Sequence, residues 1–211
     1  EILEGVTVNG LERRGDVWRL ETSDGPIEAP KVVNAAGAWA DRIAAMLGEP
    51  VPLTVVAPML MVTSRVPAFI DPVVILRGRK LSFKQLANGT VVIGGGHLAT
   101  PYRDRNETVL DWDKLAISAR TVWELFPVMR EATIVRAWAG IEAYMPDGIP
   151  VVGRSSTSEG VFHQFGFSTH GFQLGPGTGA MMAELVATGS TNVPIDGLEI
   201  ERFRPQAARQ S

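Results

Sequence analysis

"VVNAAGAWADRIAAMLG" (residues 32–48) runs from an apolar strand pattern through Asn34, Ala35, Ala36 and Gly37 into a helix pattern that ends at Gly48. This order predicts a strand–turn–helix unit. Small residues at such a turn let a ligand approach the backbone, and the N-terminus of the following helix favours phosphate or another anion. Tight packing of the helix on the strand explains the same residues, and on composition alone it is the favoured interpretation.

A second stretch, "GFSTHGFQLGPGTGAMMAELVATG" (residues 166–189), is rich in glycine. It predicts a loop followed by a helix from Gly177, with Met182 and Leu185 on the apolar face. A glycine inside an element costs about 0.5–1 kcal/mol relative to alanine, so this density indicates a bound group that lies against the backbone. The partial positive charge of the helix N-terminus favours an anionic group there. The alternative is a turn that connects a buried strand to a surface helix.

The other strand patterns lie before and between these two stretches. Residues 6–33 predict a three-stranded meander with turns at Asn9-Gly10 and Asp24-Gly25. Three prolines in residues 50–58 mark a crossover, and four strand-like runs follow, the last two joined by an Asn88-Gly89 hairpin. These runs predict an antiparallel sheet.

The clearest helix pattern covers residues 111–126, with Trp112 and Trp123 among its apolar residues. We expect both tryptophans in the core, where a charged substitution would unfold the domain. The helix is expected to cover one face of the sheet. The order of elements indicates that the first and last thirds of the chain form one domain, interrupted by the middle third. The predicted class is therefore mixed α+β and α/β, with segments 1–49, 50–135 and 136–211.

Composition excludes several functions. The 211 residues carry a formal net charge of −3 and are 45% hydrophobic, which predicts a globular chain without the basic stripe that binds nucleic acid. The absence of cysteine excludes disulfides, a thiolate nucleophile and iron–sulfur ligands within these residues. No apolar run reaches the ~18 residues of a membrane span, and no signal peptide is recognisable. Because the chain starts with Glu1 rather than Met and is inside a strand pattern by Val6, we expect the later part of a longer polypeptide.

The three histidines, His97, His163 and His170, have neither metal-ligand spacing nor a serine–histidine–aspartate arrangement. We therefore expect no metal site and interpret His97 and His163 as structural residues. His170 is the exception because it lies inside the glycine-rich stretch. The run of glycines at 94–96 lacks the spacing of a phosphate loop, and indicates a strand end close to a ligand or another backbone.

Three segments together resemble the FAD-dependent oxidoreductases of the D-amino-acid oxidase superfamily: residues 32–48, "GIEAYMPDGIPVVG" (residues 140–153) and residues 166–189. The first is shared by many flavoproteins, whereas the other two are specific. The likeness covers essentially all 211 residues in order. It is to the glycine and sarcosine oxidase branch, and most of all to the catalytic subunits of opine, hydroxyproline and proline dehydrogenases and of hydrogen cyanide synthase.

The resemblance implies the C-terminal part of a two-domain enzyme. It would contain an incomplete FAD/NAD(P)-binding domain and a substrate domain, built on an antiparallel sheet with a covering helix. In the family, an N-terminal unit with Gly-x-Gly-x-x-Gly binds the ADP half of FAD, and these residues contain no such motif. The fragment alone is thus expected to hold FAD weakly and to be inactive.

The resemblance also implies which residues bind a non-covalent FAD. Val6 matches a family residue whose backbone contacts the adenine. The turn 35–39 matches the family's turn near the pyrophosphate and flavin, and residues 169–174 match the segment that lies along the flavin ring. The helix after Gly177 would stabilise the anionic reduced flavin. The implied cofactor-binding residues are Val6, Ala35, Ala36, Gly37, Trp39, Thr169, His170, Gly171, Phe172, Gln173 and Leu174.

Three positions depart from the relatives. Glu142 stands where glycine oxidases carry an arginine for the substrate carboxylate, and Gln173 stands where sarcosine oxidases use a lysine for the same purpose. Val92 stands where some of them place the lysine that promotes reaction with oxygen. These departures favour a dehydrogenase that passes electrons to a partner subunit or carrier. The residues expected on the substrate side, with Glu142 facing Gln173, are Glu142, Tyr144, His170 and Gln173.

The function that the resemblance implies is FAD-dependent oxidation of a C–N bond in a secondary amine or amino acid, such as an opine, an imino acid, a sarcosine-like compound or a D-amino acid. Hydride would pass to the flavin and the imine would hydrolyse, with the rate coming from orientation of the neutral amine. Two alternatives stay open: an oxidase that produces hydrogen peroxide, and a non-catalytic substrate-binding or subunit-docking fragment. The expected partners are the small-molecule substrate and an electron-accepting subunit, with no nucleic acid and no transmembrane segment. The expected location is cytoplasmic, or peripheral to the inner face of the membrane.

Overall fold

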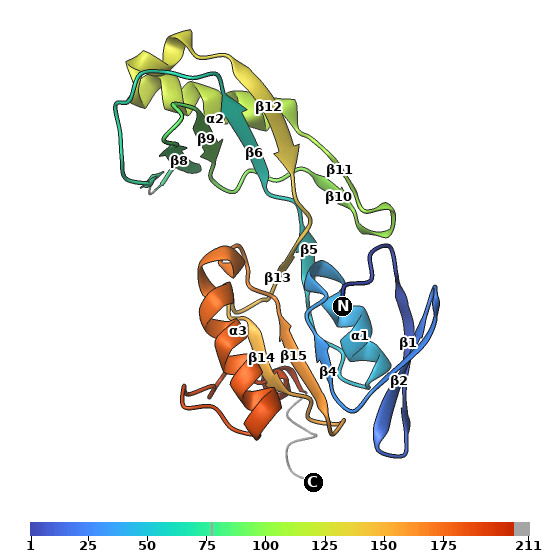
Figure 1. Ribbon diagram of the computed structural model, residues 1–211. Helices are drawn as coiled ribbons and strands as arrows, with labels where there is room; N and C mark the ends of the chain where they lie inside the picture. Colours follow the sequence, from blue (N-terminus) through green and yellow to red (C-terminus); the bar gives the residue numbers. More distant parts are fainter. Residues whose placement is uncertain (77, 205–211) are drawn as a thin grey trace. The chain divides into compact units, whose positions relative to one another are not determined.

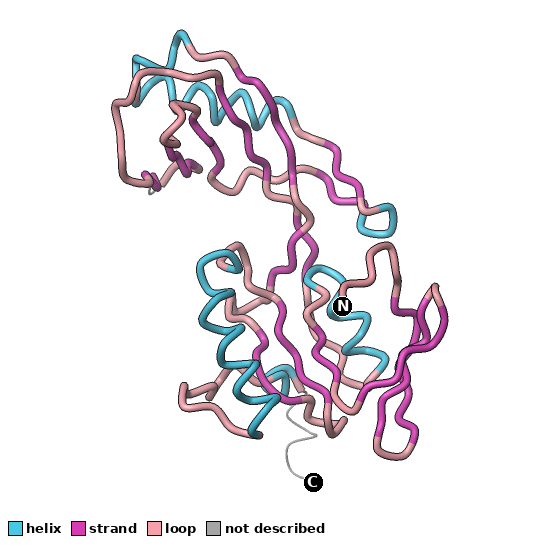
Figure 2. The backbone as a smooth tube through the Cα atoms, viewed as in Figure 1, coloured by secondary structure: helices cyan, strands magenta, loops and turns pink. Residues whose placement is uncertain are grey.

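The computed structural model describes residues 1–76 and 78–204, which fall into two compact units (Figures 1 and 2). Unit 1 contains Glu1–Thr54 and Ala143–Ser211, and unit 2 contains Val55–Glu142. The first and last parts of the chain thus form one unit that the middle part interrupts. The structure divides the chain after Thr54 and after Glu142, whereas the sequence pattern placed these divisions after residues 49 and 135.

Unit 1 is built on a three-stranded sheet with a helix on each face (Figure 1). Its elements are β4 (Val32–Asn34), α1 (Ala40–Met46), β14 (Val151–Arg154), β15 (Val161–Phe165) and α3 (Gly171–Thr188). The strand order is β14–β15–β4, where β15 is antiparallel to β14 and parallel to β4. Ala44 of α1 packs with Phe165 on one face, and Leu185 of α3 packs with Phe162 on the other. Because successive strand residues point to opposite faces, β15 needs both helices to bury its apolar side chains.

A three-stranded antiparallel meander completes unit 1. It consists of β1 (Val8–Arg14), β2 (Val17–Thr22) and β3 (Gly25–Ala29), and the short helix η4 (Ile200–Phe203) lies near the C-terminal end of the unit's described residues. The meander is anchored by Trp18, which is buried with Leu47 and Val161. The predicted turn at Asn9-Gly10 is wrong, because these residues form an irregularity inside β1. The chain reverses at Gly15, which supplies the positive φ of 60° that the turn requires.

Unit 2 contains a five-stranded antiparallel sheet in the order β12–β6–β9–β8–β7. Its strands are β6 (Met59–Thr63), β7 (Val74–Leu76), β8 (Leu81–Gln85), β9 (Val91–Gly94) and β12 (Ile134–Ala139). The predicted hairpin at Asn88-Gly89 joins β8 to β9, and Gly89 has a φ of 89°. One face is covered by α2 (Trp112–Leu125), which buries Leu115 and Val122 against Phe83 and other core residues.

Short elements surround this sheet. They are β10 (Thr100–Tyr102) and β11 (Glu107–Val109), which pair with each other, and the 3₁₀ helices η2 (Arg103–Arg105) and η3 (Pro127–Glu131). Where the chain passes between the units, β5 (Thr54–Val56) pairs with β13 (Glu142–Tyr144). The mixed α+β and α/β class predicted from the sequence is confirmed. No helix within residues 1–76 and 78–204 has the length and apolar character needed to cross a membrane.

Helix α2 begins where the sequence pattern predicts, but its tryptophans lie elsewhere. Asp111 caps the helix by accepting a hydrogen bond from the Lys114 backbone N–H. Leu115 and Val122 are buried, whereas Trp112 is 67% exposed and Trp123 is 45% exposed. The expectation that both tryptophans are core residues is therefore wrong. The two residues are three helical turns apart and form a stripe beside the buried one, so their spacing alone does not select the face that packs.

The glycines at 94–96 allow β9 and β8 to approach closely. A Cβ atom on Gly95 would lie 2.4 Å from the backbone nitrogen of Leu81. A Cβ on Gly94 would lie 2.5 Å from Leu60 Cδ2. The interpretation of this run as a strand end close to another backbone is confirmed.

We predict that Leu115→Ala lowers the free energy of unfolding of unit 2 by about 2–5 kcal/mol, because it leaves a cavity in the core. The matched substitution Trp112→Lys on the same helix should change it by no more than about 0.5 kcal/mol, because Trp112 is mostly exposed. Urea-induced unfolding measures both values. Equal losses for the two variants would contradict the assignment of the buried face.

Candidate cofactor site

A cavity of about 730 Å³ in unit 1 lies between the start of the chain and the strand–turn–helix unit. Its walls are mostly apolar, and four of the implied cofactor-binding residues line it together: Val6, Ala35, Ala36 and Trp39. Its volume falls in the range of about 300–1,000 Å³ typical of small-molecule and cofactor sites. The residues present therefore fit an organic cofactor whose apolar faces are buried.

The turn that forms one wall follows directly from the end of β4. Gly37 adopts a φ of 54°, and the Trp39 N–H donates a 2.9 Å hydrogen bond to the Ala36 carbonyl. The chain then passes through the 3₁₀ helix η1 (Gly37–Trp39) into α1. Gly37 shapes the turn without lining the cavity. The turn lies at the carboxyl end of a strand in a parallel pair, the position where open α/β sheets bind ligands.

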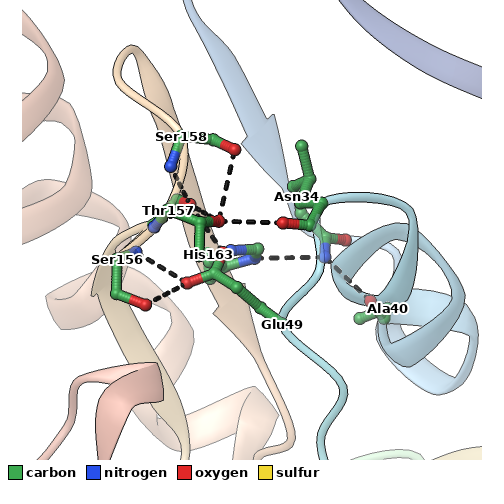
Figure 3. A network of polar contacts seen from close by, with 9 residues as sticks. Asn34, Ala40, Glu49, Ser156, Thr157, Ser158 and His163 are labelled. Atoms are coloured by element: carbon green, nitrogen blue, oxygen red, sulfur yellow. Dashed lines mark hydrogen bonds and ion pairs between the residues drawn. The ribbon is translucent and has the colours of Figure 1, made fainter. Parts of the chain in front are cut away.

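Behind this turn lies a buried network of polar side chains (Figure 3). The Asn34 amide Nδ2 donates to the Ala40 carbonyl at 2.9 Å and lies 3.3 Å from His163 Nδ1. The other ring nitrogen, His163 Nε2, is 3.0 Å from Glu49 Oε2. His163 is completely buried, and Glu49 is 5% exposed. The interpretation of His163 as a structural residue did not include this carboxylate partner.

Glu49 is ionised at neutral pH in spite of its burial. Its Oε2 accepts a hydrogen bond from Ser155 Oγ at 2.6 Å, and its Oε1 accepts from the Ser156 N–H at 2.6 Å and from Ser156 Oγ at 2.5 Å. Burial alone would raise the pKa of this carboxyl, but the hydrogen bonds from His163, Ser155 and Ser156 outweigh burial and lower the pKa to about 2. Four donors satisfy the carboxylate, which is the condition for keeping a charge in the interior.

The segment between β15 and α3 has an unusual backbone. Ser168 and Thr169 have positive φ angles of 50° and 72°, and Gly166 before them has 75°. The segment is tied to β13, because the Met145 N–H donates to Ser168 Oγ at 3.1 Å and the Ser168 N–H donates to the Ala143 carbonyl at 3.2 Å. Positive φ in a β-branched residue such as threonine is uncommon, and such strain is concentrated at ligand-binding sites.

Helix α3 begins at Gly171, so the predicted helix start at Gly177 is wrong. Residues 171–176, expected in a glycine-rich loop, form the first turns of the helix. The glycines at 171, 175 and 179 fall four residues apart on one side, while Met182 and Leu185 are buried in the core. Tertiary packing of the apolar face therefore outweighs the low helix propensity of glycine.

The start of α3 presents exposed side chains. Phe172 is completely exposed, and Gln173 and Leu174 are also exposed. The cap residue His170 makes no side-chain hydrogen bond to the helix. Backbone N–H groups in the first turn of a helix have no acceptor within the helix, and they carry partial positive charge. The segment 169–174 therefore offers donors and an apolar ring on one exposed helix start.

The remaining candidate residues lie on other elements. Glu142 and Tyr144 are the first and last residues of β13, and both are half-buried. Glu142 belongs to unit 2 and Gln173 to unit 1, so their facing each other stays a prediction. His97 lies in unit 2, where burial and the charges of Lys80 and Lys114 lower its pKa. Among residues 1–76 and 78–204, no three His, Asp or Glu side chains form a group that could hold a metal ion.

The fold defines a two-unit protein of mixed α/β and α+β structure, in which the antiparallel unit interrupts the sequence of the unit that contains the cavity. The chain belongs to the FAD dependent oxidoreductase family, whose model matches residues 1–185. The chain is therefore an FAD-dependent oxidoreductase by family, and FAD is the family's cofactor. The family resemblance seen in the sequence is confirmed.

Named relatives and solved structures agree with this family. The chain is 30% identical to sarcosine oxidase subunit beta of Rhodobacter capsulatus, over 97% of this chain and 48% of that protein. It is 28% identical to the mitochondrial sarcosine dehydrogenase of Mus musculus, over 96% of this chain and 24% of that protein. The crystal structure of L-proline dehydrogenase from P. horikoshii superposes with a TM-score of 0.86 at 29% identity, covering 95% of this chain and 54% of that one. The chain thus spans about half the length of these relatives, or less.

Two features of the site were missed by sequence reasoning. The pairing of Glu49 with His163 joins residues 114 positions apart, and neither has a motif around it. Ser168 stands beside a predicted residue, but its role comes from a positive φ that only the backbone reveals. The glycine two residues before this strained pair, Gly166, was the one local signal.

We predict that Thr169→Gly raises the free energy of unfolding by up to about 1 kcal/mol, because glycine adopts a φ of 72° without the penalty of about 1–2 kcal/mol that a side chain imposes. The control Thr191→Gly, also in unit 1 but without positive φ, should lower it by about 0.5–1 kcal/mol. Urea denaturation compares the two. A loss of stability at Thr169 as large as that at Thr191 would show that the segment is not strained.

We predict that the contribution of Glu49 to stability depends on acid pH. Its pKa is about 2 in the folded protein against 4.5 ordinarily, so the contribution is complete above pH 4.5 and is lost as pH falls towards 2. At about 1.4 kcal/mol per unit, the contribution is on the order of 3 kcal/mol. The difference in unfolding free energy between wild type and Glu49→Gln should therefore shrink between pH 4.5 and 2. Urea-induced unfolding across this pH range measures both proteins, and a difference that stays constant would contradict the prediction.

Proposed function

We propose that this chain forms part of an enzyme that oxidises a C–N bond of a secondary amine or amino acid and passes the electrons to a partner subunit or carrier. Family membership supports the FAD-dependent oxidoreductase part of this proposal. The observation that carries the rest is the cavity in which Val6, Ala35, Ala36 and Trp39 meet from two separate segments. The names of the relatives support an amine or amino acid as the substrate class.

Each wall of the cavity has a separate task in this proposal. The small side chains of Ala35 and Ala36 leave the backbone accessible to the cofactor, and Val6 and Trp39 supply apolar surface that excludes water. Bound FAD supplies the hydride acceptor. The backbone N–H groups in the first turn of α3 favour negative charge on a bound group.

The substrate would be held by polar side chains rather than by an arginine. Glu142 carries a negative charge where relatives use an arginine, so we assign it to a cationic part of the substrate. Gln173 is exposed at the start of α3 and offers an amide that donates and accepts hydrogen bonds. Tyr144 and His170 complete the proposed substrate side. Their contribution to rate is to orient the amine.

The electron acceptor distinguishes two candidate functions. Val92 in β9 is half-buried and apolar, which favours a dehydrogenase without an oxygen-activating lysine at that position. Lys84 is nevertheless the register partner of Val92 on β8, and the side chains of such partners lie on the same face of the sheet. A lysine on this face favours the second candidate, an oxidase that produces hydrogen peroxide.

We predict that the complete natural polypeptide containing these residues purifies with bound FAD and reduces artificial dyes with a secondary amine faster than it consumes oxygen. Ala35→Leu should raise the FAD dissociation constant at least about tenfold, because the added side chain fills the cavity. Ala45→Leu, an equally exposed alanine on α1 outside the cavity, should leave the constant unchanged. Flavin fluorescence titration and paired dye and oxygen assays measure these quantities.

Three results would contradict parts of this proposal. A colourless polypeptide that does not take up FAD would support the non-catalytic fragment. Fast oxygen consumption with no dye reduction would support the oxidase. Equal loss of FAD affinity in Ala35→Leu and Ala45→Leu would show that FAD does not bind in this cavity.

A further inference from the structure

We infer that Glu49 and His163 are positioning residues for cofactor binding, which act through Asn34 to hold residues 34–40 in the conformation that lines the cavity. Asn34 lines the cavity, whereas Glu49 and His163 do not. This inference rests on the proposed function, because it takes the cavity as the place where FAD binds.

The Asn34 side chain fits the turn in one orientation. Its Nδ2 donates to the Ala40 carbonyl at 2.9 Å, and its Oδ1 accepts from the Ala36 N–H at 3.3 Å. Rotation of the amide by half a turn would place two acceptors together at Ala40 and two donors together at Ala36. The side chain thus ties both ends of the turn, and the second hydrogen of Nδ2 is left for His163 Nδ1, 3.3 Å away.

The orientation of Asn34 is fixed in turn by the tautomer of His163. Because Nδ1 accepts from Asn34, the ring proton resides on Nε2 and is donated to Glu49 Oε2 at 3.0 Å. The ionised carboxylate accepts but cannot donate, so it selects this tautomer. The direction of donation therefore runs from the turn to Glu49 without a break: Ala36 donates to Asn34, Asn34 to His163, and His163 to Glu49.

Stability alone does not account for this arrangement. Removing a carboxylate and an imidazole from water is costly, so the burial of this pair is weak evidence for a gain in stability. The network ends on the two backbone groups that define the turn, the Ala36 N–H and the Ala40 carbonyl. Supporting residues of this kind fix the geometry of a site that they do not touch.

The strand register supplies a matched control. His163 is the register partner of Asn34 in the parallel pair β15–β4. The preceding residue, Phe162, points to the opposite face of the sheet and packs with Met182 and Leu185 of α3. Phe162→Leu therefore disturbs the same strand and a core of similar burial without touching the network.

The test measures FAD dissociation constants and melting temperatures of the complete polypeptide with four changes. His163→Leu removes the acceptor for Asn34 and the donor to Glu49. His163→Gln can restore both, because its amide accepts at one atom and donates at the other. The double variant His163→Leu with Glu49→Leu replaces the pair by apolar side chains. Phe162→Leu is the control.

We expect His163→Leu to weaken FAD binding about tenfold, equivalent to about 1.4 kcal/mol, with His163→Gln recovering most of the loss. The double variant should lower the melting temperature below that of His163→Leu, because Ser155 and Ser156 lose their acceptor, while its FAD affinity should stay within about twofold of that of His163→Leu. Phe162→Leu should lower the melting temperature and leave the affinity within about twofold of wild type.

Affinities that follow the melting temperature across all four variants would overturn the inference, because the network would then be purely structural. Failure of the proposed function is recognised separately, since the wild-type polypeptide would then bind no FAD at all.

Discussion

The parallel pairing of β4 with β15 is the constraint on which unit 1 depends. It places Asn34 beside His163, although 129 residues separate them, and it brings the turn after β4 to the edge of the sheet where the cavity lies. The two faces of the sheet can then be covered by α1 and α3. Without this pairing, the cavity wall at Ala35 and Ala36 would have no fixed position.

Local patterns made the architecture largely predictable from the sequence. The strand–turn–helix unit at 32–48 and the Asn88-Gly89 hairpin are determined by residues close together in the chain. Their patterns can therefore be recognised from the sequence alone. The meander was predicted, but its first turn was assigned to Asn9-Gly10. Gly10 instead lies at an irregularity inside β1, and the turn between β1 and β2 forms at Gly15.

The errors concern choices that tertiary packing makes. Trp112 and Trp123 are apolar and helically spaced, but the sheet receives the neighbouring face of α2. The glycines after Gly171 weaken a helix when judged by propensity, yet the buried residues Met182 and Leu185 hold α3 together. Glu49 and His163 gave no local signal, because a buried pair formed across 114 residues has no periodicity to detect. Four residues that line the cavity could be predicted from the sequence, whereas the buried pair Glu49 and His163 behind them could not.

The insertion of unit 2 between β4 and β15 has a consequence for how the chain folds. Contacts between residues so far apart carry a large loop-closure entropy and slow the folding of a domain. Strands β5 and β13, at the two ends of the inserted segment, pair with each other. Once unit 2 has formed, this pairing holds its entry and exit points together, so that β4 and β15 meet as if only a short connection separated them. Formation of the inserted domain thereby reduces the loop-closure entropy of pairing β4 with β15, the pairing on which the cofactor cavity depends.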